Sequence, residues 1–167
     1  PSAKFAVMIL PSEQTRPAAD TEADESAARG INAQGYTNLA QFVQDGGTLI
    51  CFDGSCGAVI RQMKLPLKNV LDGLRSSDFY CPGSVLRLEV DTSSPIARGM
   101  YKDTDAYFIN SSAFAAAADA NVRVVARYAK ENLLLSGWLL GEDKLRGQIA
   151  LAEVSVGKGR IVAEFDI

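Results

Sequence analysis

The sequence predicts one α/β domain, with a parallel sheet in its first half and a second half rich in strands. The chain has 167 residues, which is close to the size of a single domain. Hydrophobic residues make up 47% and charged residues 22% of the chain, an ordinary globular balance. Over residues 4–63, apolar runs alternate with a helical pattern, as in parallel strands joined by helical crossovers.

Two continuous apolar runs, residues 4–10 and 48–52, predict buried strands. Between them, residues 11–36 hold five acidic and two basic residues. Their charge, 2 − 5 = −3, equals that of the whole protein. We therefore expect residues 11–36 to form an exposed or disordered loop.

Two helices are expected on either side of the second strand. Leu39, Phe42 and Val43 have the i, i+3, i+4 spacing of one helical face, which predicts a helix over residues 36–44. The glycine-rich residues 53–57 predict a tight turn, and an apolar helix is expected to begin after it.

The second half of the chain is expected to be rich in strands. They are predicted at residues 84–90, 106–109, 122–128, 133–140, 148–156 and 160–165. The last two are separated by Gly157, Lys158 and Gly159, which predict a hairpin turn. Trp138 lies in an apolar run, so we expect it in the core or at an interface with a neighbouring domain.

Composition excludes several classes of function. The chain has no histidine, so it cannot complete a Ser-His-Asp or Cys-His-Glu triad or a histidine zinc site. A pI near 5.0 argues against nucleic acid as a partner. No apolar run reaches the roughly 18 residues of a membrane span. No secretory signal pattern is present, although one could have been removed from a precursor. We expect no metal and no cofactor in this domain.

The turn after the second strand is the segment most suited to chemistry. A sharp strand-to-helix turn can aim one side chain and the helix amides at the same point above the sheet edge. Cys56 occupies this position and is the candidate catalytic residue, with a pKa that the helix dipole would lower. Gly54, Ser55 and Gly57 are the candidate ligand-binding residues, because such a turn could cradle a phosphate or a flavin phosphate. A buried, unreactive cysteine in a glycine-rich turn is the alternative.

The other two cysteines are expected to serve packing. Cys51 lies inside the apolar strand at residues 48–52 and is expected in the core. Cys81 precedes Pro82 and Gly83 and is expected to be a half-buried turn residue. The cysteine count of three is odd, so at least one thiol is free.

Several segments resemble a known family. They are GYTNLAQFVQDGGTLICFD (35–53), LPLKNVL (65–71), FYCPGSVLRLEVDTSSPIARGM (79–100) and VARYAKENLLLSGWLLGEDKLRGQIALAEVSVGKGRIV (125–162). They resemble the class I glutamine amidotransferase-like domain found C-terminal to the catalytic domain of bacterial zinc carboxypeptidases. The stretches FYCPGS and LLSGWLLGE are the more specific ones, and about three quarters of the chain is covered.

This resemblance implies a three-layer α/β sandwich with a mostly parallel, flavodoxin-like sheet. True class I amidotransferases carry Gly-x-Cys-x-Gly and a distant His-Glu pair. Here Gly54 and Cys56 match, but residue 58 is Ala and no histidine exists. The resemblance therefore implies a non-catalytic accessory domain, spanning residues 1–167 and excised from a longer enzyme.

The implied partner is the catalytic peptidase domain of the same polypeptide, and zinc is expected only in that domain. The resemblance also implies a periplasmic or extracellular location. Assembly into a homo-oligomer is a further alternative that the sequence leaves open. One alternative is an amidase or hydrolase that uses Cys56 with a base from outside the chain. Another is a small-ligand binding module built on residues 54–57.

Overall fold

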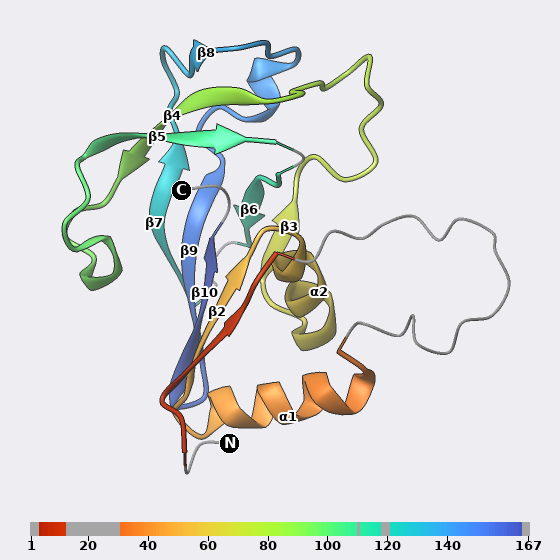
Figure 1. Ribbon diagram of the computed structural model, residues 1–167, viewed down its shortest axis with the longest axis vertical. Coiled ribbons are helices and arrows are strands. Elements are labelled where there is room, and N and C mark those ends of the chain that lie inside the picture. Colours follow the sequence, from red (N-terminus) through yellow and green to blue (C-terminus); the bar gives the residue numbers. More distant parts are fainter. Residues whose placement is uncertain (1–3, 13–30, 110, 118–120, 165–167) are drawn as a thin grey trace, which may run out of the picture.

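The computed structural model describes residues 4–12, 31–109, 111–117 and 121–164 (Figure 1). Most of the acidic segment predicted as a loop, residues 13–30, lies outside the described residues. The end of that segment is helical, because α1 (Ala33–Gln44) begins at Ala33. Asn32 caps this helix by accepting a hydrogen bond from the Gly35 amide at 2.8 Å.

The first half of the chain follows the predicted order of strand, helix, strand and helix. Strand β1 (Val7–Leu10) and strand β2 (Thr48–Phe52) pair in parallel and are joined through α1. Helix α2 (Gly54–Met63) follows β2 after a single residue. The predicted turn over residues 53–57 is therefore wrong in all but its first residue, since residues 54–57 form the first turn of α2.

The second half of the chain is rich in strands, as predicted. Its elements are β3 (Leu67–Asn69), β4 (Ser84–Val90), η2 (Pro95–Ala97), β5 (Asp103–Phe108), β6 (Phe114–Ala116), β7 (Val122–Tyr128), β8 (Leu134–Ser136), η3 (Glu142–Lys144), β9 (Ile149–Val156) and β10 (Gly159–Glu164). Strands β2, β4 and β7 have the predicted bounds. The three-residue strands β3 and β6 were not predicted.

The expectation of a mostly parallel sheet is wrong. The main path of the sheet runs β1-β2-β10-β9-β7-β4-β5. Among the described strands, only the β1–β2 and β2–β10 pairings are parallel, and the other pairings are antiparallel. The reason lies in the connections: a helix joins β1 to β2, whereas short turns such as the one between β9 and β10 return the chain at once and impose antiparallel pairing.

The three-layer arrangement is also not found in the described part of the chain, where both α-helices cover the same face of the sheet. Phe42 of α1 and Val59 of α2 belong to one buried cluster with Leu49 of β2. On the opposite face, Ile50 packs in a cluster that includes Ala97 of η2. A short 3₁₀ segment therefore stands where a third layer of helices was expected.

A third cluster of buried side chains fills the end of the molecule that is far from α1, around β4, β5 and β7 (Figure 1). Phe108 lies at its centre, with edge-to-face contacts to Phe79 and Tyr128 at 5.9 Å between ring centroids. Tyr128 also donates a hydrogen bond to the Ser112 carbonyl at 3.1 Å. These contacts fix the segment between β5 and β6, which forms part of the site described next.

Candidate functional site

The carboxyl ends of β1, β2 and β10 meet at one edge of the sheet, because these strands run in parallel. Asp53 is the single residue between β2 and α2, and it has φ 42° and ψ −117°. A residue with a Cβ rarely adopts a positive φ, so this junction carries backbone strain of the kind that gathers at functional sites. The Asp53 amide donates to the Glu164 carbonyl at 3.1 Å, and the Asp53 carbonyl accepts from the Cys56 amide at 2.9 Å.

Ser55 joins the start of α2 to the ends of two strands. Its hydroxyl donates toward the Phe52 carbonyl at 2.8 Å and the Leu10 carbonyl at 3.2 Å. It also accepts a hydrogen bond from the Phe52 amide at 3.1 Å. The Ser55 side chain is buried, so its hydroxyl is committed to backbone groups of the protein.

Cys56 faces the core of the sheet. Its side chain is 0% exposed, and its thiol donates to the Cys51 carbonyl at 3.1 Å and the Glu164 carbonyl at 3.6 Å. The expected lowering of its pKa is wrong: burial raises the pKa of the Cys56 thiol well above its ordinary value, and the neighbouring Cys51 raises it further. The cost of desolvating a thiolate outweighs any favourable effect of the helix terminus.

Cys51 lies in the core, as predicted, and burial raises its pKa to about 12. Cys81 is also buried, with 7% of its surface exposed, so the expectation of a half-buried residue is wrong. It packs in the cluster around Phe108 and contacts the Phe108 carbonyl at 4.0 Å.

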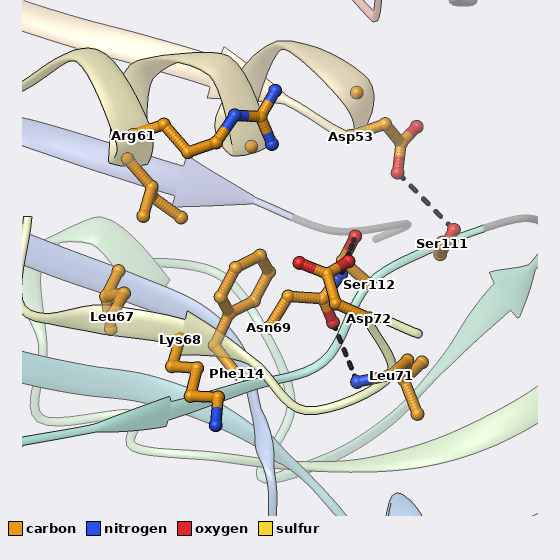
Figure 2. Close-up of a pocket in the computed structure, with 13 residues that line it drawn as sticks. Asp53, Arg61, Leu67, Lys68, Asn69, Leu71, Asp72, Ser111, Ser112 and Phe114 are labelled. Atoms are coloured by element: carbon orange, nitrogen blue, oxygen red, sulfur yellow. Dashed lines mark hydrogen bonds between the residues drawn. The ribbon is translucent and has the colours of Figure 1, made fainter. Parts of the chain in front are cut away.

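A pocket of about 530 Å³ opens beside the start of α2 (Figure 2). Asp53, Gly54 and Gly57 line it from the strand-to-helix junction, so two of the candidate ligand-binding residues reach it. Ser55 and Cys56 do not line it. The remaining lining residues come from α2, β3, the segment that follows β3, the residues before β6, and the first residue of β6: Ile60, Arg61, Leu67, Lys68, Asn69, Leu71, Asp72, Ser111, Ser112 and Phe114.

The polar side of the pocket is ordered by Asn69. Its amide nitrogen donates to Asp72 Oδ1 at 2.7 Å and to Ser112 Oγ at 3.3 Å. Its amide oxygen accepts from the Leu71 backbone amide at 3.1 Å. These bonds hold the Asp72 carboxylate at the pocket wall that faces α2 (Figure 2).

Asp53 lies on the α2 side of the pocket, where Ser111 Oγ donates to its Oδ1 at 3.4 Å (Figure 2). The carboxylate of Asp53 also acts on Glu164, at the end of β10. Burial raises the pKa of Glu164, and the Asp53 charge raises it further. Within the described residues, no three Asp, Glu, Cys or His side chains gather closely enough to hold a metal ion.

The sequence pointed to this edge of the sheet through Gly54 and Gly57, but it did not identify the charged groups of the pocket. Asp53 could have been found, because it directly follows an apolar strand whose parallel neighbours end at the same edge. No sequence motif around Asn69 or Ser111 marks either residue as part of a pocket. They line the same pocket because β3 pairs with β6, a contact between segments more than forty residues apart.

The fold resembles a part of several longer enzymes. The chain superposes on β-galactosidase from Bacillus circulans sp. alkalophilus with a TM-score of 0.56 and 12% identity, covering 97% of this chain and 20% of that one. Gan42B, a GH42 β-galactosidase from G. stearothermophilus, gives a TM-score of 0.55 and 12% identity, with 99% and 19% covered. The β-galactosidase from Rahnella sp. R3 gives 0.52 and 12%, with 98% and 20% covered.

The chain thus spans about a fifth of the length of these β-galactosidase chains. At 12% identity the likeness shows the fold alone. No protein-family model matches the sequence. No curated protein matches it either. No helix in the described ranges is long and apolar enough to cross a membrane.

Proposed function

We propose that this chain is a non-catalytic accessory domain of a larger multidomain enzyme. The fold likeness supports this, because a region of the same fold makes up about a fifth of each β-galactosidase chain compared above. The domain would contribute stability, assembly or substrate presentation to the enzyme that carries it, while the reaction takes place elsewhere in the polypeptide.

The observation that carries the proposal is the position of Cys56. An amidotransferase needs an exposed thiolate and a base that accepts its proton. Here the thiol is buried against the sheet with a raised pKa, and the chain has no histidine to act as the base. Cys56 therefore serves the packing of α2 in this proposal.

We further propose that the enzyme carrying this domain is a zinc carboxypeptidase. This finer assignment rests on the resemblance of segments such as FYCPGS and LLSGWLLGE to the domain that follows such peptidases. The catalytic peptidase domain of the same polypeptide would then be the partner, and the zinc ion would reside there.

The test uses this chain and the intact gene product. The chain is incubated with glutamine, and ammonia release is followed beside a Cys56→Ala variant; no release is expected from either. The intact product is expected to contain zinc and to remove C-terminal residues from peptides. Ammonia release by the intact product that Cys56→Ala abolishes would instead favour an amidase with a base from outside the chain, and release by the isolated chain would overturn the non-catalytic role. An intact product without a peptidase domain would overturn the carboxypeptidase assignment.

The pocket beside α2 supports a second function, that of a small-ligand binding module. It is lined by Gly54 and Gly57 and has room for a small molecule at the carboxyl end of a parallel strand, where ligands commonly bind in α/β sheets. Calorimetry against nucleotides, flavin phosphate, sugars and amino acids tests this function. An absence of heat with every class would overturn it.

A further inference from the structure

We propose that the pocket beside α2 binds a small zwitterion with an apolar body, and that free aliphatic amino acids are the class of ligand that it fits. This inference rests on the proposed role as a small-ligand binding module and names the ligand. It follows from three features of the pocket: a negative wall, a positive group opposite that wall, and an apolar floor.

The negative wall is formed by Asp72, and Asp53 lines the pocket from the start of α2 (Figure 2). Neither carboxylate takes part in an ion pair with any residue that the structure describes. Asp72 is held in place by the 2.7 Å hydrogen bond from Asn69, whose own orientation is fixed by the Leu71 amide. A fixed, unpaired carboxylate at the wall of a pocket is suited to an ammonium group.

The positive group is the guanidinium of Arg61, which faces the Asp72 wall from α2 (Figure 2). It too has no ion pair within the described ranges. Its Nη1 lies over Gly57, only 3.4 Å from where a Cβ on that residue would stand. A Cβ at residue 57 would therefore be in van der Waals contact with the guanidinium. Arg61 is the group that would hold a carboxylate, whereas the ammonium of Lys68 points away from α2 (Figure 2).

The floor between these charges is apolar. Ile60, Leu67 and Phe114 line the pocket and are themselves buried, with 8%, 6% and 1% of their surfaces exposed. An aliphatic side chain placed there would leave water for an apolar surface, whereas a carboxamide placed against these three side chains would find no hydrogen-bond partner on them. The floor therefore favours leucine over glutamine.

The same charges disfavour the phosphate-bearing ligands that a glycine-rich turn suggests. A phosphate at the start of α2 would lie beside the Asp53 carboxylate, and like charges at close range repel each other. An amino acid avoids this conflict, because its own ammonium group can face the carboxylates.

The inference is tested by calorimetric titration of the chain with L-leucine and with two analogues that each carry only one of its two charged groups. Isoamylamine lacks the carboxylate of leucine, and isocaproate lacks the ammonium group. We expect leucine to bind with a Kd of about 1 mM or tighter, and each analogue to bind at least about tenfold more weakly. Glutamine, galactose and inorganic phosphate complete the panel, and glutamine is expected to bind more weakly than leucine.

Two variants test which residue binds the ammonium group of leucine and which binds its carboxylate. Asp72→Asn keeps an acceptor for Asn69 but removes the charge, and it should weaken leucine about tenfold while leaving isocaproate unchanged. Arg61→Gln should weaken leucine to a similar degree and leave isoamylamine unchanged. Asp105→Asn and Arg98→Gln change exposed charges outside the pocket lining and serve as matched controls. Thermal melts confirm that each variant is folded.

Each outcome decides one statement. Leucine binding that weakens in both pocket variants supports the inference. Leucine binding that neither variant changes would overturn the assignment to this pocket. No heat with leucine, but heat with phosphate or galactose, would overturn the zwitterion while leaving a ligand-binding module in place. No heat with any compound would overturn both the amino-acid ligand and the role as a small-ligand binding module.

Discussion

Ser55 and Cys56 are neighbours in the first turn of α2, and both side chains bind backbone groups of the sheet. Ser55 bonds to Leu10 and Phe52, and Cys56 bonds to Cys51 and Glu164. Together they connect the carboxyl ends of β1, β2 and β10 to one helix. At the scale of single residues, the glycine-rich segment that suggested a nucleophile therefore works as a structural junction.

Replacing Ser55 by Ala should lower the free energy of unfolding by about 1–3 kcal/mol, because buried backbone groups at the ends of β1 and β2 lose a partner. Urea unfolding followed by circular dichroism measures the change. Ser76→Ala, at an exposed position, is the matched control and should stay within about 0.5 kcal/mol of the parent chain. An equally small change in Ser55→Ala would contradict the junction role.

Cys56 should resist alkylation in the native chain, because its thiol is buried and its pKa is raised. The measurement is iodoacetamide labelling against pH, with peptide mass spectrometry to locate the label. Cys51 and Cys81, also buried, should react as slowly, and all three should react fast in denaturant. Selective, rapid labelling of native Cys56 near neutral pH would reopen the catalytic alternative.

Glu164 should make stability depend on pH. Burial and Asp53 raise its pKa in the folded chain, so between the unfolded and the folded pKa the folded chain binds more protons. Stability therefore falls as pH rises through that window. Glu164→Gln should be more stable than the parent at neutral pH, and this advantage should shrink as pH falls through the raised pKa towards the ordinary glutamate value. Urea midpoints at several pH values measure it, with exposed Glu89→Gln as the control.

At the scale of elements, the junction between β2 and α2 is unusually short, since Asp53 alone turns the chain. The turn requires the positive φ at that residue. Comparing Asp53→Gly with Asp53→Ala isolates this cost, because both variants lose the carboxylate. The Gly variant should be more stable than the Ala variant by about 1 kcal/mol in urea unfolding, since glycine adopts this conformation without a Cβ clash. Equal stabilities would show that the junction is unstrained.

The elements that the sequence predicted well are those with a strong local pattern. Strand β4 alternates polar and apolar residues, and β2 is a continuous apolar run, so both have the predicted bounds. Strands β3 and β6 have three residues each, and they exist because they pair with each other. Such pairing has no local signal. The prediction of a mostly parallel sheet was wrong for a related reason, since parallel or antiparallel pairing depends on which strands become neighbours.

The same limit applies to the pocket. Gly54 and Gly57 were predicted from a local turn pattern and do line it. Asn69 reaches it through the β3–β6 pair, and Ser111 lies just before β6, so neither could be assigned from its own neighbourhood in the sequence.

At the scale of the whole molecule, Trp138 was expected in the core or at a domain interface, and it is 66% exposed. Trp138→Ser should therefore leave the free energy of unfolding of this chain within about 0.5 kcal/mol. Phe108→Ala, which removes a buried ring, should cost about 3–5 kcal/mol and is the reference. Urea unfolding measures both. A large loss in Trp138→Ser would show that this residue supports the core.

Strand β10 is the last element of the described chain, yet it lies between β2 and β9 in the sheet. During synthesis, the N-terminal strands emerge from the ribosome long before residues 159–164 do. Until then β2 has no neighbour on one side, and Leu49 and Cys51 lack their register partners Ile161 and Ala163. The centre of the sheet can therefore close only after residues 159–164 have been translated, so the pairing of β2 with β10 is a late step of folding during synthesis.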